Sequence, residues 1–186
     1  MILVNGCSFT SGEESTVAWP KFIPNTINLA TAGASNDHIV ISTVNFIRTL
    51  RKPDYAIIQW TSPDRIEISG KHLTPTSGRR YGQELVDLVF ADWNTDLARS
   101  KFKSQVALLH AYLEQQSIPH FFISAWNIQS WAQGTAPAPW LGWPDQGMVE
   151  WMGDCPRGPG GHPLELGHKR IAEQINEHIR NLGWIS

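Results

Sequence analysis

Two residues with nucleophilic side chains, Cys7 and Ser8, directly follow the first hydrophobic run of the chain. That run, residues 2–4, is short, partly β-branched and followed by an Asn-Gly pair, which predicts a buried strand ending in a tight turn. The two side chains then stand at the carboxyl end of a strand, the edge of an open α/β sheet where ligands bind. The same dipeptide also fits a strand terminus with a buried thiol and a serine that caps the next helix.

Hydrophobic periodicity divides the rest of the chain into alternating strands and helices. Strands are expected at residues 26–30, 54–60 and 118–126, and helices at 35–52, 94–116 and 164–183, with a weak helix near 82–90 in an ambiguous excursion over 65–92. The expected core includes Leu3, Ile57, Ile58, Val106, Phe121 and Ile175. Because strands that alternate with helices pair in parallel through right-handed crossovers, the predicted fold is a three-layer α/β/α sandwich with a mostly parallel, flavodoxin-like sheet. No G-x-G-x-x-G follows the first strand, which argues against a dinucleotide-binding domain.

Length and composition exclude several classes of protein. A chain of 186 residues suits one domain, residues 1–186, and a formal net charge of -2 with scattered Lys and Arg predicts no nucleic-acid partner. No apolar run approaches the ~20 residues that span a bilayer, and the start lacks a basic leader, so no membrane partner and a cytoplasmic location are expected. Two cysteines are too few for a disulfide framework, and the sequence carries no signal of oligomeric state.

Four segments together resemble the sequence blocks of the SGNH (GDSL-type) hydrolase superfamily. They are Gly6-Cys7-Ser8-Phe9 after the first strand, Gly33 in NLATAGASND, the strand end QWTSPDR, and His162-Pro163 in GGHPLELGHKRIA. No single block is specific, so the resemblance depends on their order, spacing and placement at strand ends. It covers most of the framework and leaves residues 65–92 and 127–157 uncovered.

The resemblance implies a serine hydrolase that needs no cofactor. Ser8 is the implied nucleophile and His162 the base that takes its proton, because a hydroxyl is a weak nucleophile and an imidazole titrates near neutral pH. The backbone N–H groups of Ser8 and Gly33 are the implied donors of an oxyanion hole, which stabilises the tetrahedral intermediate of acyl transfer.

The sequence departs from the family pattern at two places. Ser62 stands where the third block usually has an oxyanion asparagine, and Asn36 fits either a helix cap or a relocated donor. The aspartate usually found two or three residues before the histidine is replaced by Pro159 and Gly160. Three arrangements stay open for the base: a Ser8-His162 dyad, a triad completed by Asp154, or a weakened site.

His168 is a competing base that we interpret as a surface or supporting residue of the last helix. No histidine pair has the H-E-x-x-H spacing of a zinc protease, so no metal is expected.

Tryptophan is unusually frequent, with nine residues in the chain. Five lie in or beside a Gly- and Pro-rich loop predicted at about residues 127–161: Trp126, Trp131, Trp140, Trp143 and Trp151. These indoles either form a small core of the loop or present flat faces to an acyl chain or a sugar. The candidate substrate contacts are Trp60, Arg65, Trp140 and Trp143.

The function predicted from the sequence is a serine esterase or deacylase acting on a small-molecule or glycan acyl ester. Two alternatives use the same fold: an acyltransferase with an alcohol acceptor, and a binding module in which catalysis has decayed.

Overall fold

A parallel four-stranded sheet forms the centre of the molecule. The computed structural model describes residues 1–75, 81–127 and 138–185. The sheet order is β2-β1-β3-β6, from β1 (Ile2–Asn5), β2 (Thr26–Asn28), β3 (Tyr55–Trp60) and β6 (His120–Ser124). This order places β1 between β2 and β3, as in flavodoxin-like sheets. The predicted fold class is therefore confirmed.

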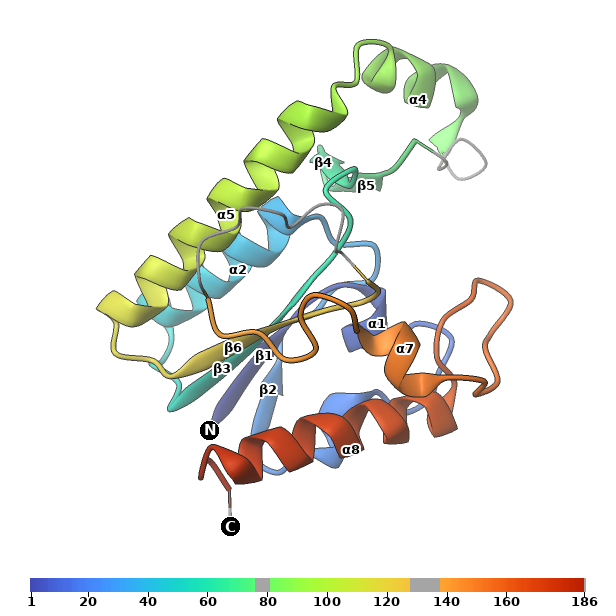
Figure 1. The fold of residues 1–186 in the computed structure, drawn as a ribbon. Coiled ribbons are helices and arrows are strands. Elements are labelled where there is room, and N and C mark those ends of the chain that lie inside the picture. Colours follow the sequence, from blue (N-terminus) through green and yellow to red (C-terminus); the bar gives the residue numbers. More distant parts are fainter. Residues whose placement is uncertain (76–80, 128–137, 186) are drawn as a thin grey trace.

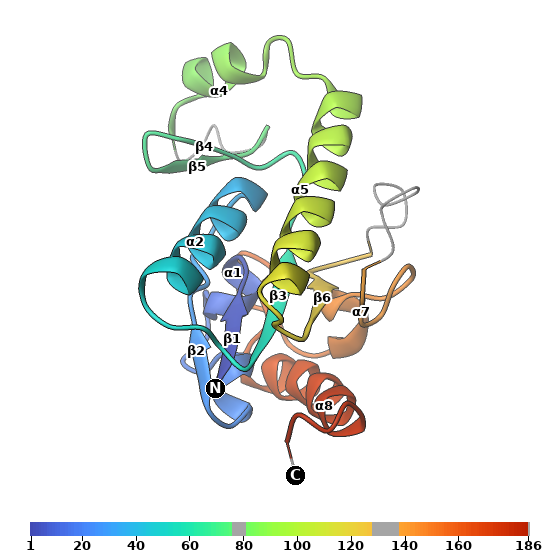
Figure 2. The same ribbon diagram turned by 90° about the vertical axis from the view of Figure 1, so that its left-hand side faces the viewer.

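Helices cover both faces of the sheet (Figures 1 and 2). Helices α2 (Asn36–Thr49) and α5 (Thr95–Gln115) pack together on one face, while α8 (Glu165–Asn181), α7 (Met148–Met152) and a short 3-10 helix (Trp19–Phe22) lie on the other. Strands β1, β3 and β6 are almost continuously apolar because both of their faces are buried. All six residues expected in the core are buried.

Polar side chains fix the starts of the two helices that share one face. Ser35 caps α2, since its side chain accepts a hydrogen bond from the N–H of His38 at 3.2 Å. Asn94 caps α5 in the same way through the N–H of Leu97, at 2.9 Å. The cap of α2 is thus Ser35, and the interpretation of Asn36 as a cap was wrong.

The excursion over residues 65–92 contains a hairpin that periodicity did not predict. Strands β4 (Ile66–Ile68) and β5 (Lys71–Leu73) pair antiparallel around Ser69 and Gly70, whose φ angles are 49° and 75°. A two-residue turn with both φ angles positive matches the twist of a hairpin. Three-residue strands are too short to show a clear alternation. The expected helix near 82–90 is present as α4 (Gln83–Phe90).

The segment predicted as a loop at 127–161 also contains regular structure. Helix α7 lies within it, and Trp140 forms a parallel bridge with Phe122 at the edge of β6. The N–H of Phe122 donates to Pro139 O at 2.8 Å, and the N–H of Leu141 donates to Phe122 O at 2.9 Å. Residues 139–141 therefore extend the sheet beyond β6. Trp131 lies outside the described residues.

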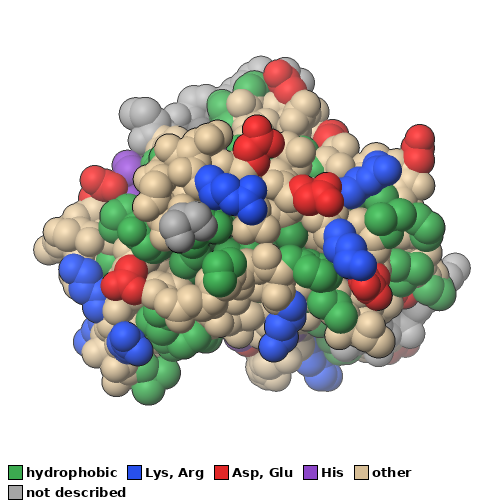
Figure 3. Space-filling model, turned by 90° about the horizontal axis from the view of Figure 1, so that it is seen from below, with side chains coloured by type: hydrophobic (Ala, Val, Ile, Leu, Met, Phe, Trp, Pro, Cys, Tyr) green, Lys and Arg blue, Asp and Glu red, His purple; other side chains and the backbone are tan. Residues whose placement is uncertain are grey.

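Charges of both signs are mixed on the surface. On the face shown in Figure 3, Lys and Arg side chains lie among Asp and Glu, with apolar patches between them. No helix in the described ranges is long and apolar enough to cross a membrane.

Candidate active site

The turn that carries Ser8 is held by a buried glutamine of the neighbouring strand. Helix α1 (Ser8–Ser11) starts directly after β1, with Cys7 at its N-cap position. The N–H of Cys7 and the hydroxyl of Thr10 both donate to Gln59 Oε1, at 2.8 and 3.1 Å. A Cβ atom on Gly6 would lie 2.5 Å from the same oxygen. The close approach of Gln59 therefore requires glycine at position 6, and it fixes the turn between β1 and α1.

Ser8 itself is buried and faces its neighbour. Ser8 is 1% exposed, and its Oγ donates to Cys7 Sγ at 3.8 Å. Ser8 is the first residue of α1 and Cys7 is the cap, so the interpretation of Ser8 as a helix cap does not hold. Within the described residues, no hydrogen bond joins Ser8 Oγ to His162.

His162 lies between two glutamates that follow Ser8 in the sequence. Its Nδ1 is 2.9 Å from Glu14 Oε2, and its Nε2 is 3.5 Å from Glu13 Oε2. An ionised carboxylate only accepts hydrogen bonds, so in the neutral imidazole the shorter of the two contacts assigns the proton to Nδ1, which donates it to Glu14. Nε2 then carries the lone pair, with Glu13 Oε2 beside it at 3.5 Å. This is the tautomer that a general base requires.

Glu14 is held in place by the backbone of the segment that leads to His162. Glu14 Oε1 accepts from the N–H of Gly160 at 2.7 Å, and Oε2 also accepts from the N–H of His162 at 3.2 Å. The N–H of Gly160, followed by the His162 ring, lowers the pKa of Glu14 below its ordinary range. Glu14 also has a φ of 67°, a conformation that costs energy in a residue other than glycine and that clusters at functional sites.

The glycines before His162 make room for this carboxylate. A Cβ atom on Gly158 would lie 2.6 Å from Glu14 Oε2, and one on Gly160 would lie 3.1 Å from either carboxylate oxygen. By contrast, Asp154 is exposed, and no hydrogen bond or ion pair in the described part of the chain joins it to His162. The structure thus places Glu14, and not Asp154, beside the histidine.

The backbone N–H groups of Ser8 and Gly33 are the oxyanion-hole donors that the resemblance implies. No hydrogen bond among the described residues uses the N–H of Ser8 or of Gly33. Gly33 has a φ of 77°, which favours glycine, and a Cβ there would lie 3.3 Å from the Cβ of His72. The loop after β2 is therefore packed tightly against the β4–β5 hairpin.

Asn36 and Ser62 are already engaged with the chain. The Asn36 amide pairs with the backbone of Thr61, because Nδ2 donates to Thr61 O and Oδ1 accepts from its N–H, both at 3.0 Å. Ser62 Oγ accepts from the N–H of Asp64 at 3.3 Å and donates to the Asp64 carboxylate at 3.4 Å. Asn36 therefore fixes the end of β3, and Ser62 stabilises the turn that follows.

An aromatic wall runs from His162 to Arg65. The ring of Phe9 lies 5.6 Å from His162 and 6.0 Å from Trp126, and the Arg65 guanidinium lies 5.9 Å from Trp126. Arg65 Nη1 is buried without a hydrogen-bond partner among the described residues. A buried donor without a partner is rare, which makes Arg65 a candidate contact for an acceptor on a ligand.

The tryptophans expected to contact substrate, Trp60, Trp140 and Trp143, lie elsewhere. Trp60 has no exposed surface and packs edge-on against Phe102 and Phe122, so it belongs to the core and is not a substrate contact. Trp140 packs on Phe122 at 5.5 Å and on Trp143 at 5.1 Å. Trp140 and Trp143 are expected either to form a small core or to contact substrate, and this packing favours the small core.

His168 is a buried residue of α8. Its Nδ1 accepts from the N–H of Trp19 at 3.3 Å, and its Nε2 has no partner in the described ranges. Burial, assisted by the charge of His162, lowers the pKa of His168 to about 4. Trp19 Nε1 donates to Thr10 Oγ1 at 3.3 Å, so His168 supports the turn between β1 and α1 through Trp19.

Comparisons with known proteins identify the fold. No protein-family model and no curated protein matches the chain. Among solved structures, the psychrotrophic esterase EstA from Pseudoalteromonas sp. matches with a TM-score of 0.61 at 12% identity, over 97% of each chain. TesA matches with a TM-score of 0.59 at 12% identity, over 97% of this chain and 98% of that one.

A third match belongs to the family that the sequence blocks resemble. The lipolytic G-D-S-L family protein from Veillonella parvula has a TM-score of 0.53 at 12% identity, over 95% of this chain and 96% of that one. The expected resemblance therefore holds at the level of the fold: the chain has the fold of the SGNH (GDSL-type) esterases, with a widely diverged sequence.

Sequence reasoning missed Glu14, Gln59 and Thr10. For Glu14 a signal was present, since Glu13 and Glu14 are the first carboxylates after Ser8. The family pattern, however, directs attention to the residues just before His162. Gln59 carries no such signal, because a single polar residue at the end of an apolar strand has many roles.

Proposed function

We propose that this protein is a serine hydrolase that cleaves an acyl ester, with Ser8 as nucleophile, His162 as general base and Glu14 as the orienting carboxylate. The observation that carries the proposal is the 2.9 Å hydrogen bond from His162 Nδ1 to Glu14, which leaves Nε2 able to accept a proton. The fold shared with EstA and the other esterases supports the same reaction class.

The reaction follows from these groups. Ser8 Oγ attacks the carbonyl carbon of the ester while His162 Nε2 takes the hydroxyl proton, and the N–H groups of Ser8 and Gly33 stabilise the oxyanion. The intermediate collapses, His162 returns the proton to the departing alkoxide, and the acyl group stays on Ser8. Water then attacks with His162 again as base, which releases the acid and restores the serine.

Ser8 has to turn before it can react. Its Oγ faces Cys7 in the structure, and rotation about χ1 between staggered positions carries the hydroxyl away from the sulfur. Catalytic hydrogen bonds are often long or absent without substrate, so the present orientation fits a resting enzyme. Glu13 and Glu14 both lie where they stabilise the positive charge that His162 gains on taking the proton.

The side chains of the aromatic wall indicate which kind of substrate the site would bind. Phe9 and Trp126 offer apolar surface to an acyl chain, and Arg65 offers a donor to an acceptor or anionic group of the ester. We therefore infer a small-molecule or glycan acyl ester, with Arg65 as a specificity contact.

The test compares three variants in hydrolysis of p-nitrophenyl esters of several acyl lengths. Ser8→Ala should abolish activity and labelling by a fluorophosphonate probe. Glu14→Gln should lower kcat by about 10²- to 10⁴-fold, as loss of the orienting charge does in serine proteases. Asp154→Asn is the matched control and should leave kcat unchanged. Far-UV circular dichroism checks that each variant is folded.

The outcomes separate the alternatives. Equal rates for wild type and Ser8→Ala at every acyl length contradict the proposal and favour a binding module. Labelling of a different serine overturns the assignment of the nucleophile. Ester formation with an added alcohol at the expense of free acid identifies an acyltransferase that uses the same residues.

A further inference from the structure

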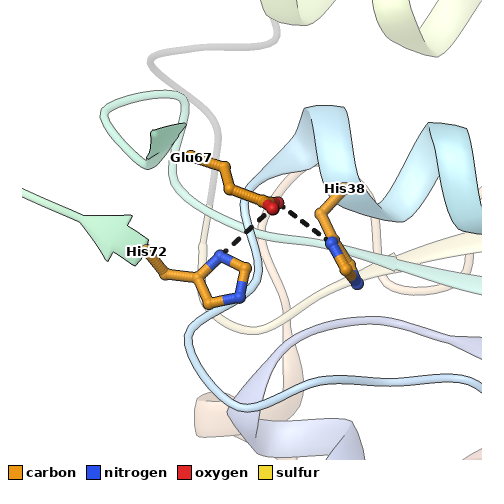
Figure 4. A group of neighbouring side chains, drawn as sticks. All are labelled: His38, Glu67 and His72. Carbon is orange, nitrogen blue, oxygen red and sulfur yellow. Dashed lines mark hydrogen bonds and ion pairs between the residues drawn. The ribbon is translucent and has the colours of Figure 1, made fainter. Parts of the chain in front are cut away.

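Two histidines and a glutamate meet between the β4–β5 hairpin and the start of α2. Glu67 and His72 are direct partners across the hairpin, so their side chains project from the same face. His38 lies in the first turn of α2, where the Ser35 cap fixes the backbone. Figure 4 shows both imidazoles directed toward the Glu67 carboxylate.

The distances within this cluster suit a metal ion. Glu67 Oε2 lies 3.0 Å from His38 Nδ1 and 3.7 Å from His72 Nδ1. Two ligands of a tetrahedral zinc ion are about 3.4 Å apart when each bond is ~2.0–2.1 Å long. The observed separations lie on either side of this value, and one donor atom from each residue lies within 4.8 Å of the others.

We propose that His38, Glu67 and His72 bind a divalent metal ion of the zinc class. Two imidazole nitrogens and one carboxylate oxygen form a donor set that zinc shares with other first-row divalent ions such as iron(II), and three protein ligands leave one coordination position of a tetrahedral ion open to water or to a ligand. The side chains are 28%, 30% and 15% exposed, so the donors are partly withdrawn from water while an entry path stays open. This proposal does not depend on the proposed esterase activity.

A bound ion would tie three segments together at the catalytic edge. It would link α2 to both strands of the hairpin, and His72 packs against Gly33, whose N–H we assign to the oxyanion hole. The ion would therefore fix the hairpin on α2, beside the loop after β2.

A second histidine cluster provides a contrast within the same chain. His120 Nδ1 lies 2.9 Å from Ile118 O, and its Nε2 lies 2.8 Å from His110 Nδ1. Both nitrogens of His120 are thus engaged by protein atoms, and Glu114 is 63% exposed. This cluster is better explained as a hydrogen-bonded chain. His110→Ala is therefore a matched control, since it also removes one half-buried imidazole.

The test is isothermal titration of the chelator-treated protein with zinc chloride, alongside thermal unfolding with and without zinc. The wild type should bind one ion and unfold at a higher temperature when it is bound. His72→Ala and Glu67→Gln should each weaken zinc binding by about tenfold or more, as losses around metal sites do. His110→Ala should bind as the wild type does.

Several results would overturn the proposal. They are the absence of zinc binding by the wild type, unchanged binding by the His38→Ala/His72→Ala double variant, or loss of binding in His110→Ala. The His38→Ala variant removes one half-buried side chain from the first turn of α2 and leaves both strands of the hairpin unchanged, so it keeps the test valid if His72→Ala fails to fold. Loss of zinc binding with normal ester hydrolysis separates this site from the catalytic one.

Discussion

Replacement of His168 by asparagine should make the protein less sensitive to mild acid. The imidazole is fully buried, and its pKa is lowered from 6.5 to about 4, first by burial and then by the charge of His162. The unfolded chain therefore takes up a proton on this residue at a pH at which the folded protein does not. The contribution that the buried neutral His168 makes to the free energy of unfolding is therefore present above pH 6.5 and is lost as the pH falls from about 6.5 to about 4.

The size of the effect follows from these two pKa values. One pKa unit corresponds to about 1.4 kcal/mol, so the full loss is on the order of 3 kcal/mol, and the part between pH 7 and pH 5.5 is about 1.2 kcal/mol. Such a change lowers the unfolding temperature of a domain of this size by roughly 3–5 °C. Most carboxylates stay ionised over that interval, so His168 can be observed apart from them.

Urea unfolding of wild type and His168→Asn at pH 7 and pH 5.5 measures the difference. Asparagine can place its amide oxygen where His168 Nδ1 accepts from the N–H of Trp19, but it does not titrate. Burial also lowers the pKa values of His120 and His178, and these residues are common to both proteins and cancel. Equal losses of stability in the two proteins would refute the reasoning.

Two further predictions concern the proposed site. Trp126→Ala should raise KM about tenfold or more in ester hydrolysis with little change in unfolding temperature, whereas Trp140→Ala should lower the unfolding temperature and leave KM unchanged, because it packs on Phe122. The opposite pattern would return Trp140 to the substrate site. Gly158→Ala should lower kcat by about 10²-fold, because its Cβ would lie 2.6 Å from Glu14 Oε2 and displace the carboxylate; an unchanged kcat would contradict this.

The framework could be predicted from the sequence because its elements are strongly periodic. The last helix, α8, buries Ile171, Ile175 and Ile179 on one face, and the strands β3 and β6 are nearly all apolar. The β4–β5 hairpin was not predicted, since its strands of three residues are held by a turn at residues 69–70 and by contact with α2. Short elements of this kind depend on tertiary contacts more than on local pattern.

The positions of Ser8 and Gly33 at one edge of the sheet could be predicted from the sequence. Ser8 and Gly33 follow β1 and β2, and parallel strands bring their carboxyl ends to one edge of the sheet. The neighbours of His162 could not be predicted in this way, because Glu14 reaches it from the opposite end of the chain. The cluster of His38, Glu67 and His72 was missed for the same reason, as its members come from separate elements.

Glu14 lies beside His162, so the absence of an aspartate just before His162 does not leave the histidine without a carboxylate partner. In this chain the proposed nucleophile and the proposed orienting carboxylate both follow β1, with Ser8 in α1 and Glu14 just after it, and the segment before His162 contributes only backbone N–H groups and small residues. Gly158 and Gly160 are then a requirement of the site, since side chains there would collide with the carboxylate. In the proposed site, docking of residues 158–162 onto the loop after α1 brings Glu14 to His162 Nδ1, so the proposed base meets its orienting carboxylate only when these two distant segments are packed together.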